Sequence, residues 1–327
     1  MNSAIVTKRG FTYDRAWMIV DDQNKCLTQR EKPAMALIQP QILDGHTRRH
    51  LLDELTGVEP GTKPGNEHVN KIQYGTASAT SEQISASGPN GGLAGGTSVK
   101  DIAQGHVRDS VMAKPTIMQH PYEQVILQFS APNTTPLQLQ PDPQGISRTV
   151  TIWNDTCEAI DEGDEVAEWL SAYMKTSCRL VRMADEFVRS VDDRYAEAED
   201  QVGFADAFPF LLISTESLED LNSRLDESLP MNRFRPNIVV SGCSSSFAED
   251  TWRQTRIGNC EFNVVKPCDR CVITTTDQET GKRGQEPLRT LAKYRNRDNK
   301  VLFGQNLIPR TTGRIGLGDQ VEVLSYN

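Results

Sequence analysis

Short runs of apolar, β-prone residues alternate with turn-forming residues in the first part of the chain. Ala16–Asp22 has the pattern of a strand, and the dipeptide NK at 24–25 turns the chain into CLTQR, so this pair predicts a β-hairpin. Met35–Ile42 is predicted as a third strand. Glu123–Ser130 and Ser147–Trp153 continue the pattern farther along. The first part of the sequence is therefore predicted to be mainly β-sheet.

Residues 57 to about 114 interrupt this pattern. The stretch TASATSEQISASGPNGGLAGGTS holds almost no large apolar side chain, and ten of the 23 glycines lie between Gly57 and Gly105. Such a segment cannot bury enough apolar surface to offset the entropy that it loses on ordering. We predict a disordered insertion at 57–115 and not a separate domain.

One segment, GDEVAEWLSAYMKTS, has the period of an amphipathic helix. Its apolar positions are Val166, Trp169, Leu170, Tyr173 and Met174. We predict that this stripe packs in the core and that Asp164 caps the helix N-terminus. The acidic residues at its start are Asp161, Glu162, Asp164 and Glu165. We interpret them as a solvated helix start, favoured by the helix dipole, and not as a metal site.

The second half of the chain returns to strands and adds one more helix. Phe208–Ile213 is predicted as a buried strand, and STESLEDLNSRL as a helix capped by Ser214 or Thr215. The further predicted strands are NIVVSG, CEFNVVKP, CVITTT and QVEVL. Because strands outnumber helices and the turns are rich in Gly and Pro, we predict a mixed α/β, β-rich fold with a β-barrel-like core and attached helices.

Composition narrows the class of protein. The chain has 327 residues, enough for two domains of ordinary size. Its formal net charge is −9 with a pI near 5.2, which argues against nucleic acid as a partner and is compatible with a soluble enzyme. No run of 18 apolar residues occurs, so no transmembrane segment is predicted.

The seven cysteines are odd in number and scattered, which predicts free thiols in a reducing compartment. They occupy positions 26, 157, 178, 243, 260, 268 and 271. The first residues, MNSAIVTKRGFTYDR, hold no apolar h-region, so no secretory signal is predicted. We expect a protein that is cytoplasmic or associated with mitochondria, and not secreted.

The stretch KPCDRCVITTTD places Cys268 and Cys271 in a C-x-x-C pair, with Arg270 directly before the second thiol. A structural zinc site would need two more ligands, but all five histidines lie within the first 120 residues, and Cys243 and Cys260 have unusual spacing for such a site. A thioredoxin-like pair needs a helix N-terminus, whereas VITTT predicts a strand.

Two further interpretations of this motif remain open. Both cysteines could be buried structural residues, since free Cys is among the residues found most often in cores. Alternatively, one thiolate could bind a metal that prefers soft ligands, with Arg270 holding an anionic cofactor. The motif alone does not decide between these alternatives.

A longer series of motifs narrows the choice. The series runs FPFLLISTESLEDLNSRL, FRPNIVVSG, AEDTWRQTRIG, CDRCVITTTDQETG, EPLRTL, LFGQN and GDQVEVL, preceded by YDRAWMIVDD and REKPAMALIQP. In this order it resembles the MOSC-domain family, and most closely the mitochondrial amidoxime-reducing-component branch. The resemblance covers nearly the whole chain except the insertion.

The resemblance implies an architecture. A MOSC-type β-barrel core with attached helices would follow an N-terminal MOSC-associated β-barrel module. We expect the N-terminal module at 1–56 and 116–160, the insertion at 57–115, and the MOSC domain with a linking helix at 161–327.

The resemblance also implies a site for a molybdopterin-type molybdenum cofactor. Cys271 in RCVITTTD matches the catalytic cysteine that ligates the metal, and Cys268 becomes a neighbour that does not bind it. The other implied cofactor contacts are Arg15, Arg235, Asp269, Arg270 and Asn306. Arginine forks suit a buried phosphate. Without the resemblance, Arg15 and Arg235 would be read as members of ordinary ion pairs.

The sequence departs from the family pattern in several places. The Lys-Ser pair that ends the family's first strand has no clear equivalent, and Lys8 has the wrong spacing, so this first strand is predicted to be missing or replaced. Ala207 and Phe208 stand where small hydroxyl residues often precede the PFL strand. We expect no cluster-binding ferredoxin-like domain and no membrane anchor. Pyridoxal phosphate binding accompanies the family as a descriptive term, but we expect no sulfurase domain of that type.

The leading functional hypothesis is a molybdenum oxidoreductase. The resemblance implies reduction of N-hydroxylated compounds such as amidoximes and hydroxylamines by oxo transfer, with electrons from a b-type cytochrome and its NADH-dependent reductase. The alternative is a carrier that holds the cofactor or a labile sulfur at Cys271 without turnover. A cofactor-free remnant is the third hypothesis. Turnover and molybdenum content distinguish the three.

Overall fold

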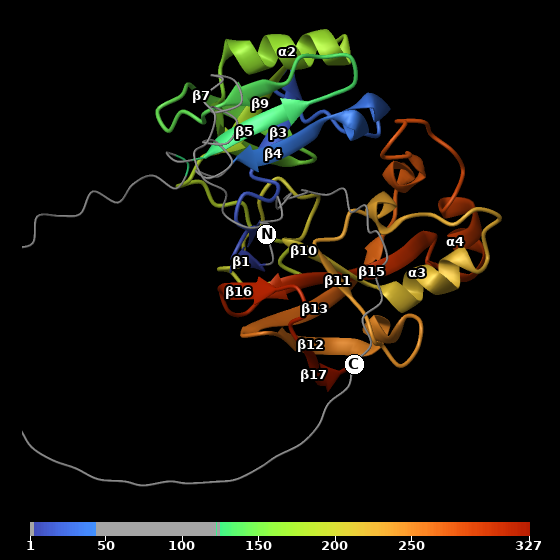
Figure 1. Cartoon of the computed structure of the whole chain (residues 1–327). Coiled ribbons are helices and arrows are strands. Elements are labelled where there is room, and N and C mark those ends of the chain that lie inside the picture. Colours follow the sequence, from blue (N-terminus) through green and yellow to red (C-terminus); the bar gives the residue numbers. More distant parts are fainter. Residues whose placement is uncertain (1–2, 44–121, 123–124) are drawn as a thin grey trace, which may run out of the picture.

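The computed structural model describes residues 3–43, 122 and 125–327, which fold into two stacked units (Figure 1). The upper unit, as drawn in Figure 1, contains two antiparallel sheets and helix α2. The lower unit contains a seven-stranded sheet, a small three-stranded sheet and helices α3 and α4. The predicted insertion at 57–115 lies outside the described residues.

The two sheets of the upper unit face each other across an apolar core. One sheet has the order β3-β9-β8-β7, and the other has the order β4-β5-β6. Their strands are β3 (Trp17–Asp21), β4 (Gln39–Leu43), β5 (Ile126–Ser130), β6 (Leu137–Leu139), β7 (Ser147–Ile152), β8 (Asp155–Asp161) and β9 (Cys178–Met183). The strands predicted at 16–22, 123–130 and 147–153 are thus confirmed with small shifts at their ends.

Helix α2 (Asp164–Met174) covers the core of the upper unit. The predicted stripe is confirmed, because Val166, Leu170 and Met174 are buried in one cluster with Leu127 of β5. The predicted cap is wrong: the N-cap residue is Gly163, and no side chain caps the helix. Helix α2 packs on β9 and not between two domains, so the division of the chain at 161 stays a prediction.

The acidic cluster before α2 is only half solvated, in contrast to the prediction. Asp164 is 84% exposed, but the Asp161 and Glu162 side chains are at most 2% exposed. Burial is tolerated because each pairs with arginine: Asp161 with Arg148 and Arg179, and Glu162 with Arg182. These two carboxylates are therefore structural.

The lower unit is built on one curved sheet with the order β11-β10-β15-β13-β12-β17, and β14 pairs with β15. Its strands are β10 (Phe210–Ser214), β11 (Ile238–Val240), β12 (Trp252–Ile257), β13 (Cys260–Asp269), β14 (Asn296–Arg297), β15 (Lys300–Pro309) and β17 (Val321–Tyr326). A second sheet, β16-β1-β2, consists of β1 (Ser3–Thr7), β2 (Gly10–Phe11) and β16 (Gly313–Gly316). From the sequence, the family's first strand is predicted to be missing or replaced, and the structure has a strand at Ser3–Thr7 that is not among the predicted strands.

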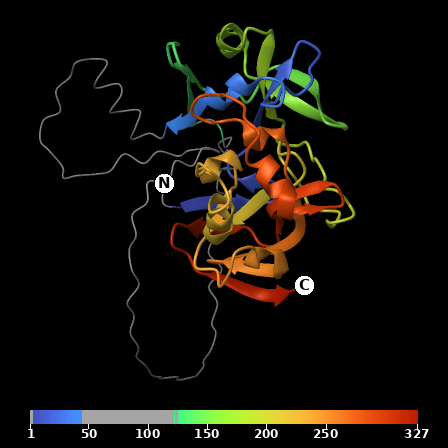
Figure 2. The same cartoon turned by 90° about the vertical axis from the view of Figure 1, so that its right-hand side faces the viewer.

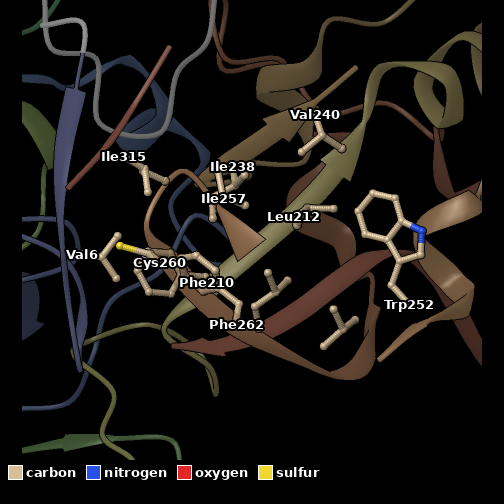
Figure 3. Close-up of a cluster of buried hydrophobic side chains, with 12 residues drawn as sticks. Val6, Phe210, Leu212, Ile238, Val240, Trp252, Ile257, Cys260, Phe262 and Ile315 are labelled. Atoms are coloured by element: carbon tan, nitrogen blue, oxygen red, sulfur yellow. The ribbon is translucent and has the colours of Figure 1, made fainter. Parts of the chain in front are cut away.

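The core of the lower unit joins both of its sheets. Val6 of β1 and Ile315 of β16 pack with Cys260, Phe210 and Phe262 of the large sheet (Figure 3). The Phe210 and Phe262 rings meet edge to face at 5.4 Å between centroids. The chain is therefore β-rich with barrel-like sheets and attached helices, as predicted.

The helices of the lower unit lie at its edge. They are α3 (Thr215–Asn222) and α4 (Leu288–Tyr294), with short 3-10 turns η1 (Pro33–Leu37), η2 (Met231–Arg233), η3 (Ala248–Thr251) and η4 (Val272–Thr275) elsewhere in the chain. Ser214 caps α3 by accepting a hydrogen bond from the Ser217 backbone N–H, which confirms one of the two predicted caps.

Two predicted strands are turns in the structure. The first half of Met35–Ile42 forms the 3-10 turn η1, because Pro33 stands at its start and favours helical entry. The segment CVITTT forms η4 and not a strand. The loop after η4, orange in Figure 2, reaches the blue N-terminal segment, where Arg283 donates hydrogen bonds to the backbone carbonyls of Gln29 and Arg30.

Candidate functional site

A cavity of about 510 Å³ lies between the two units. Residues of β3, β4 and β5 line its upper part, and residues of β10, β13 and β15 line its lower part. The charged side chains around it are Asp14, Arg15, Arg30, Asp206, Arg235, Lys266, Asp269 and Arg270. Five cations thus face three carboxylates. The charge of the cavity wall favours an anionic ligand.

Cys271 enters the cavity wall where β13 has ended and η4 begins. Its carbonyl accepts hydrogen bonds from the Thr274 backbone N–H at 3.2 Å and from the Thr274 hydroxyl at 2.9 Å. This turn fixes the backbone of Cys271 while its thiol remains partly exposed. A partly exposed thiol in a fixed position is suited to bind a metal or a ligand.

Cys268 also lines the cavity but has a different environment. Its sulfur accepts a hydrogen bond from Nη1 of Arg270 at 2.9 Å. The Nη2 atom of Arg270 donates to the carbonyl of Phe234 at 2.6 Å, so the guanidinium ties the end of β13 to the segment after η2. The two cysteines therefore have different surroundings, and which of them binds a metal stays a prediction.

The zinc alternative finds no donor set in the described residues. No group of three His, Cys, Asp or Glu side chains in this part of the chain is arranged to hold a metal. Cys243 and Cys260 lie in the core cluster of the lower unit and do not line the cavity. Cys26 does line it, but burial, with Asp206 and Glu31 nearby, raises the pKa of Cys26 to about 11. Cys26 is therefore a poor thiolate ligand at neutral pH.

Arg15 and Arg235 meet on one wall of the cavity. Nη2 of Arg15 donates to the backbone carbonyl of Arg235 at 3.1 Å, and Nη1 donates to Asp14 at 2.5 Å. Asn237 donates to the same Asp14 carboxylate and accepts from the Leu211 N–H, which anchors this wall to β10. The alternative of an ordinary ion pair thus holds in part for Arg15.

Arg235 is different because, among the described residues, no side chain or backbone group forms a hydrogen bond with its guanidinium. Burial, with the like charge of Arg15, lowers the pKa of Arg235. Both arginines have left-handed backbone conformations, with φ of 52° and 55°. Such φ values are uncommon for bulky residues and gather at functional sites. The chain therefore holds a desolvated cation toward the cavity at a conformational cost.

The polar residues on β13 and β15 complete the lower wall. Asn306 of β15 donates to the carbonyl of Lys266 at 3.2 Å, where a β-bulge interrupts the pairing of the two strands. The Lys266 ammonium lies 5.3 Å from the centroid of the Tyr195 ring. Asp269, at the end of β13, is exposed at the rim. The bulge explains how neighbouring strands present several polar groups to one cavity.

Arg30 is a cavity residue that the sequence did not indicate. Its guanidinium pairs with Asp206 at 2.9 Å, stacks 4.4 Å from the Trp153 ring centroid and contacts the Cys271 thiol. Burial lowers the pKa of Arg30, but Asp206 outweighs this effect and the net shift is upward. Arg30 lies in REKPAMALIQP, but nothing in that motif relates it to Cys271.

Two buried guanidinium nitrogens on the cavity wall lack hydrogen-bond partners within the described residues. They are Nη1 of Arg30 and Nε of Arg270. Buried donors are normally paired, so unpaired ones call for a ligand or water. With the unpaired guanidinium of Arg235, they form a donor set that fits an anionic group such as a phosphate.

The structure brings all six sequence-predicted residues to this one cavity: Cys271, Arg15, Arg235, Asp269, Arg270 and Asn306. Their roles remain predictions. Ala207 and Phe208, which depart from the family pattern, also line the cavity. Lys8 is exposed and does not line it. Besides Arg30, the sequence analysis does not name Lys266, Asp206 and Asn237. No sequence motif marks these residues, and only the fold brings them to the cavity.

Two family models match the chain. The model described as "MOSC domain" matches residues 199–322, and the model described as "MOSC N-terminal beta barrel domain" matches residues 1–88 and 110–177. The cavity lies where residues of both matched regions meet. In the described part of the chain, no helix is long and apolar enough to cross a membrane.

The chain is similar to several curated proteins. It is 42% identical over 178 residues to mitochondrial amidoxime-reducing component 1 of Mus musculus, covering 50% of this chain and 52% of that protein. It is 38% identical over 180 residues to mitochondrial amidoxime-reducing component 1 of Homo sapiens, covering 51% and 53%. The chain thus spans about half the length of the curated relatives that it matches.

One solved structure also aligns with the chain. This is YiiM from Geobacillus stearothermophilus, with a TM-score of 0.28 and 12% identity, covering 36% of this chain and 55% of that one. A likeness this weak carries no argument about fold or function.

Proposed function

Because the chain belongs to the MOSC-domain family, we propose that the cavity at Cys271 holds a molybdenum cofactor and that the protein reduces N-hydroxylated compounds by oxygen-atom transfer. The observation that carries this proposal is the surplus of cationic groups, two of them with buried unpaired nitrogens, around a partly exposed cysteine. The names of the similar animal proteins support the reaction class.

The residues present fit an anionic cofactor with a phosphate and a soft metal. The guanidinium groups of Arg15, Arg235 and Arg270 are planar and always charged, which suits a buried phosphate and a polar ring system. We assign the thiolate of Cys271 to the metal because molybdenum, like other soft-ligand metals, is suited to sulfur donors. Asn306 and Asp269 would offer polar contacts from the strand ends.

When bound, the cofactor supplies the two-electron chemistry that reduces an N–O bond, and the protein supplies position and electrostatics. Arg30 holds its charge beside Cys271 through Asp206 and Trp153, so it restricts where the ligand thiolate can point. The apolar side chains of β3 and β5 exclude water from the upper part of the cavity. Low local polarity strengthens the contacts that orient the bound groups.

We further propose a b-type cytochrome and its NADH-dependent reductase as electron donors, and a mitochondrial association. The mitochondrial association rests on the names of the similar proteins, and the electron donors rest on the resemblance to the family. The chain matches only about half of these relatives, so the partners need their own test. Co-sedimentation with isolated mitochondria and reduction by purified cytochrome would provide it.

The test of the proposed function is turnover. Protein from a cofactor-competent host should reduce benzamidoxime to benzamidine with a reduced viologen as artificial electron donor. Cys271→Ser should lose at least a hundredfold in rate, whereas the matched variant Cys268→Ser should stay within about threefold of the wild type. Bound molybdenum without turnover would reject the reductase and support the carrier.

A further inference from the structure

The cavity has two chemically different parts, and the proposed function uses only one of them. The charged groups of the lower part gather around Cys271. The upper part is lined by apolar side chains of the two upper sheets and of the short segment before β4. They include Ile19, Ile38, Ile42, Leu127, Phe129 and Leu180. We call this upper part the apolar compartment.

The alternation of side chains along the strands places part of the apolar lining, and Met18 and Ile152 of the opposite core cluster line the cavity as well. On β3, Ile19 points toward the compartment, whereas the next residue, Val20, is fully buried in the opposite core cluster. On β4 and β5, Ile42 and Leu127 face the same space. Two inward sheet faces therefore meet, as in a barrel, but leave room between them.

Part of the apolar lining keeps exposed area although it lies inside a β module, whereas Leu127, Phe129 and Leu180 are buried in the core. Ile19, Leu27, Met35, Ile38 and Ile42 are only partly buried in their cluster. A packed core normally fills such positions. The polar amides at the edge are already satisfied, since Gln278 donates to Gln29 at 3.2 Å and to the Thr276 carbonyl at 3.0 Å. The compartment thus offers apolar area and few free polar groups.

We propose that this compartment binds the hydrocarbon part of the substrate, so that the preferred substrates are N-hydroxylated compounds with an alkyl or aryl chain. This inference rests on the proposed function. The polar N–OH head lies at the Cys271 end and the chain extends between the two upper sheets. The volume of about 510 Å³ is that of the whole cavity, of which the apolar compartment is one part, and it is within the usual range of small-molecule sites, about 300–1,000 Å³.

We assign the hydrocarbon chain of the substrate to this compartment because the compartment is continuous with the charged part of the cavity. The compartment and the charged part form one cavity, so a ligand held at Cys271 has direct access to the apolar walls. Burial of each methylene in an apolar site strengthens binding by about fourfold. The compartment therefore determines which N-hydroxylated compounds bind tightly, while Cys271 determines what happens to them.

The test is a series of straight-chain amidoximes from acetamidoxime to decanamidoxime, with the matching amidines as non-reducible analogues. Dissociation constants are measured by calorimetry on the protein from a cofactor-competent host. Affinity should rise about fourfold per methylene over several carbons, for amidoximes and amidines alike. An affinity independent of chain length, or no binding of any member, would overturn the inference.

Substitutions at Met35 test whether the hydrocarbon chain binds in the apolar compartment. Met35→Trp fills the compartment, so the affinity should no longer depend on the chain length of the amidoxime. Met35→Ala enlarges the compartment, so the affinity should keep rising up to longer chains than in the wild type. Ile146→Trp is the matched control, because Ile146 is 72% exposed and outside the cavity, and it should behave as the wild type. Circular dichroism identifies a variant that fails to fold. If the affinity of both Met35 variants depended on chain length as in the wild type, the assignment of the chain to this compartment would be contradicted.

This design separates the inference from the proposed function. A chain-length dependence without any turnover would reject the reductase and leave the compartment as a binding site. Turnover of short amidoximes with no chain-length dependence would keep the reductase and reject the compartment.

Discussion

At the scale of single residues, the most informative feature is a cation that forms no ion pair within the described residues. Arg235 is desolvated, has a left-handed backbone and finds no hydrogen-bond partner for its guanidinium among the described residues. In FRPN, the sequence indicates only that an arginine is present, and the assignment to a cofactor comes from resemblance. The structure adds the physical reason, because an unpaired buried charge is costly unless a ligand compensates it.

Replacing Arg235 therefore tests the anion site directly. Arg235→Ala should stabilise the ligand-free protein by about 1 kcal/mol, because it removes a partly buried charge that forms no ion pair within the described residues. Sulfate should raise the Tm of the wild type at constant ionic strength, and this rise should be at least halved in the variant. Thermal unfolding by circular dichroism measures both effects.

The control for this experiment is Arg253→Ala, which removes an exposed arginine on β12 that lies outside the cavity. It should leave both the Tm and the sulfate response at their wild-type values. An Arg235→Ala protein that is less stable and keeps the full sulfate response would show that the guanidinium has a structural partner.

Some residues of the cavity could not be found in the sequence. Arg30 reaches Cys271 only because the loop after η4 docks on the N-terminal segment. Lys266 and Asn306 meet through a β-bulge, and a bulge has no reliable sequence signature when no glycine marks it. Motifs gave six residues of the site, but the contacts among them depend on tertiary structure.

At the scale of elements, the pattern of apolar positions predicted most strands and the stripe of α2. It failed where side chains compete for backbone hydrogen bonds. In VITTT, the Thr274 hydroxyl donates to the carbonyl of Cys271 and the Thr275 hydroxyl to that of Val272, which stabilises a 3-10 turn over a strand. The turn, and not the predicted strand, sets the position of Cys271.

Asp161 joins three elements through one carboxylate. It accepts from Arg148 of β7, from Arg179 of β9 and from the N–H of Gly163 before α2. Burial raises the pKa of Asp161, but these donors outweigh it and the net shift is downward. A lowered pKa means that the stability contributed by Asp161 is present above its unfolded pKa of about 3.9 and is lost as pH falls through the folded value.

Asp161→Asn should accordingly destabilise the protein by about 2 kcal/mol at pH 7. This is less than the ~3–5 kcal/mol of a fully buried pair, because both arginines are partly exposed. The difference from the wild type should shrink below about pH 4. Urea unfolding from pH 3 to pH 7 checks the prediction, with the exposed Asp164→Asn as control. A difference that is constant over this range would contradict it.

Arg189 fixes the irregular segment that carries cavity residues before β10. Its guanidinium donates to the carbonyls of Gly203 at 2.9 Å and Ala205 at 2.6 Å, and to Asp155 at 2.7 Å. Arg189→Ala leaves buried carbonyls unpaired and should cost about 2–3 kcal/mol in the free energy of unfolding. Arg189→Lys should recover only part of this, because an ammonium cannot reproduce the fork.

Urea unfolding measures the effect of both Arg189 variants. Arg194→Ala is the control, since Arg194 is an exposed arginine in the same segment. Equal stability of the Arg189→Ala and Arg194→Ala proteins would be inconsistent with this role of Arg189.

At the scale of the whole molecule, the site exists only where the two units meet. Arg15 and Arg30 come from the N-terminal part of the chain, and Arg235, Arg270 and Cys271 come from the lower unit (Figure 1). The order of motifs indicated both modules. It could not indicate the shared cavity or its apolar compartment, because these depend on how two sheet faces lie relative to β13 and β15.

The central claim is that Cys271 ligates molybdenum in this cavity. The most direct measurement is the molybdenum-to-protein ratio, with the spectroscopic signature of the metal–thiolate bond, for the wild type, Cys271→Ser and Cys268→Ser from a cofactor-competent host. We expect about one molybdenum per chain in the wild type and in Cys268→Ser, and loss of the metal or of its thiolate signature in Cys271→Ser. A wild type without molybdenum, or a Cys271→Ser protein with an unchanged signature, would contradict the claim.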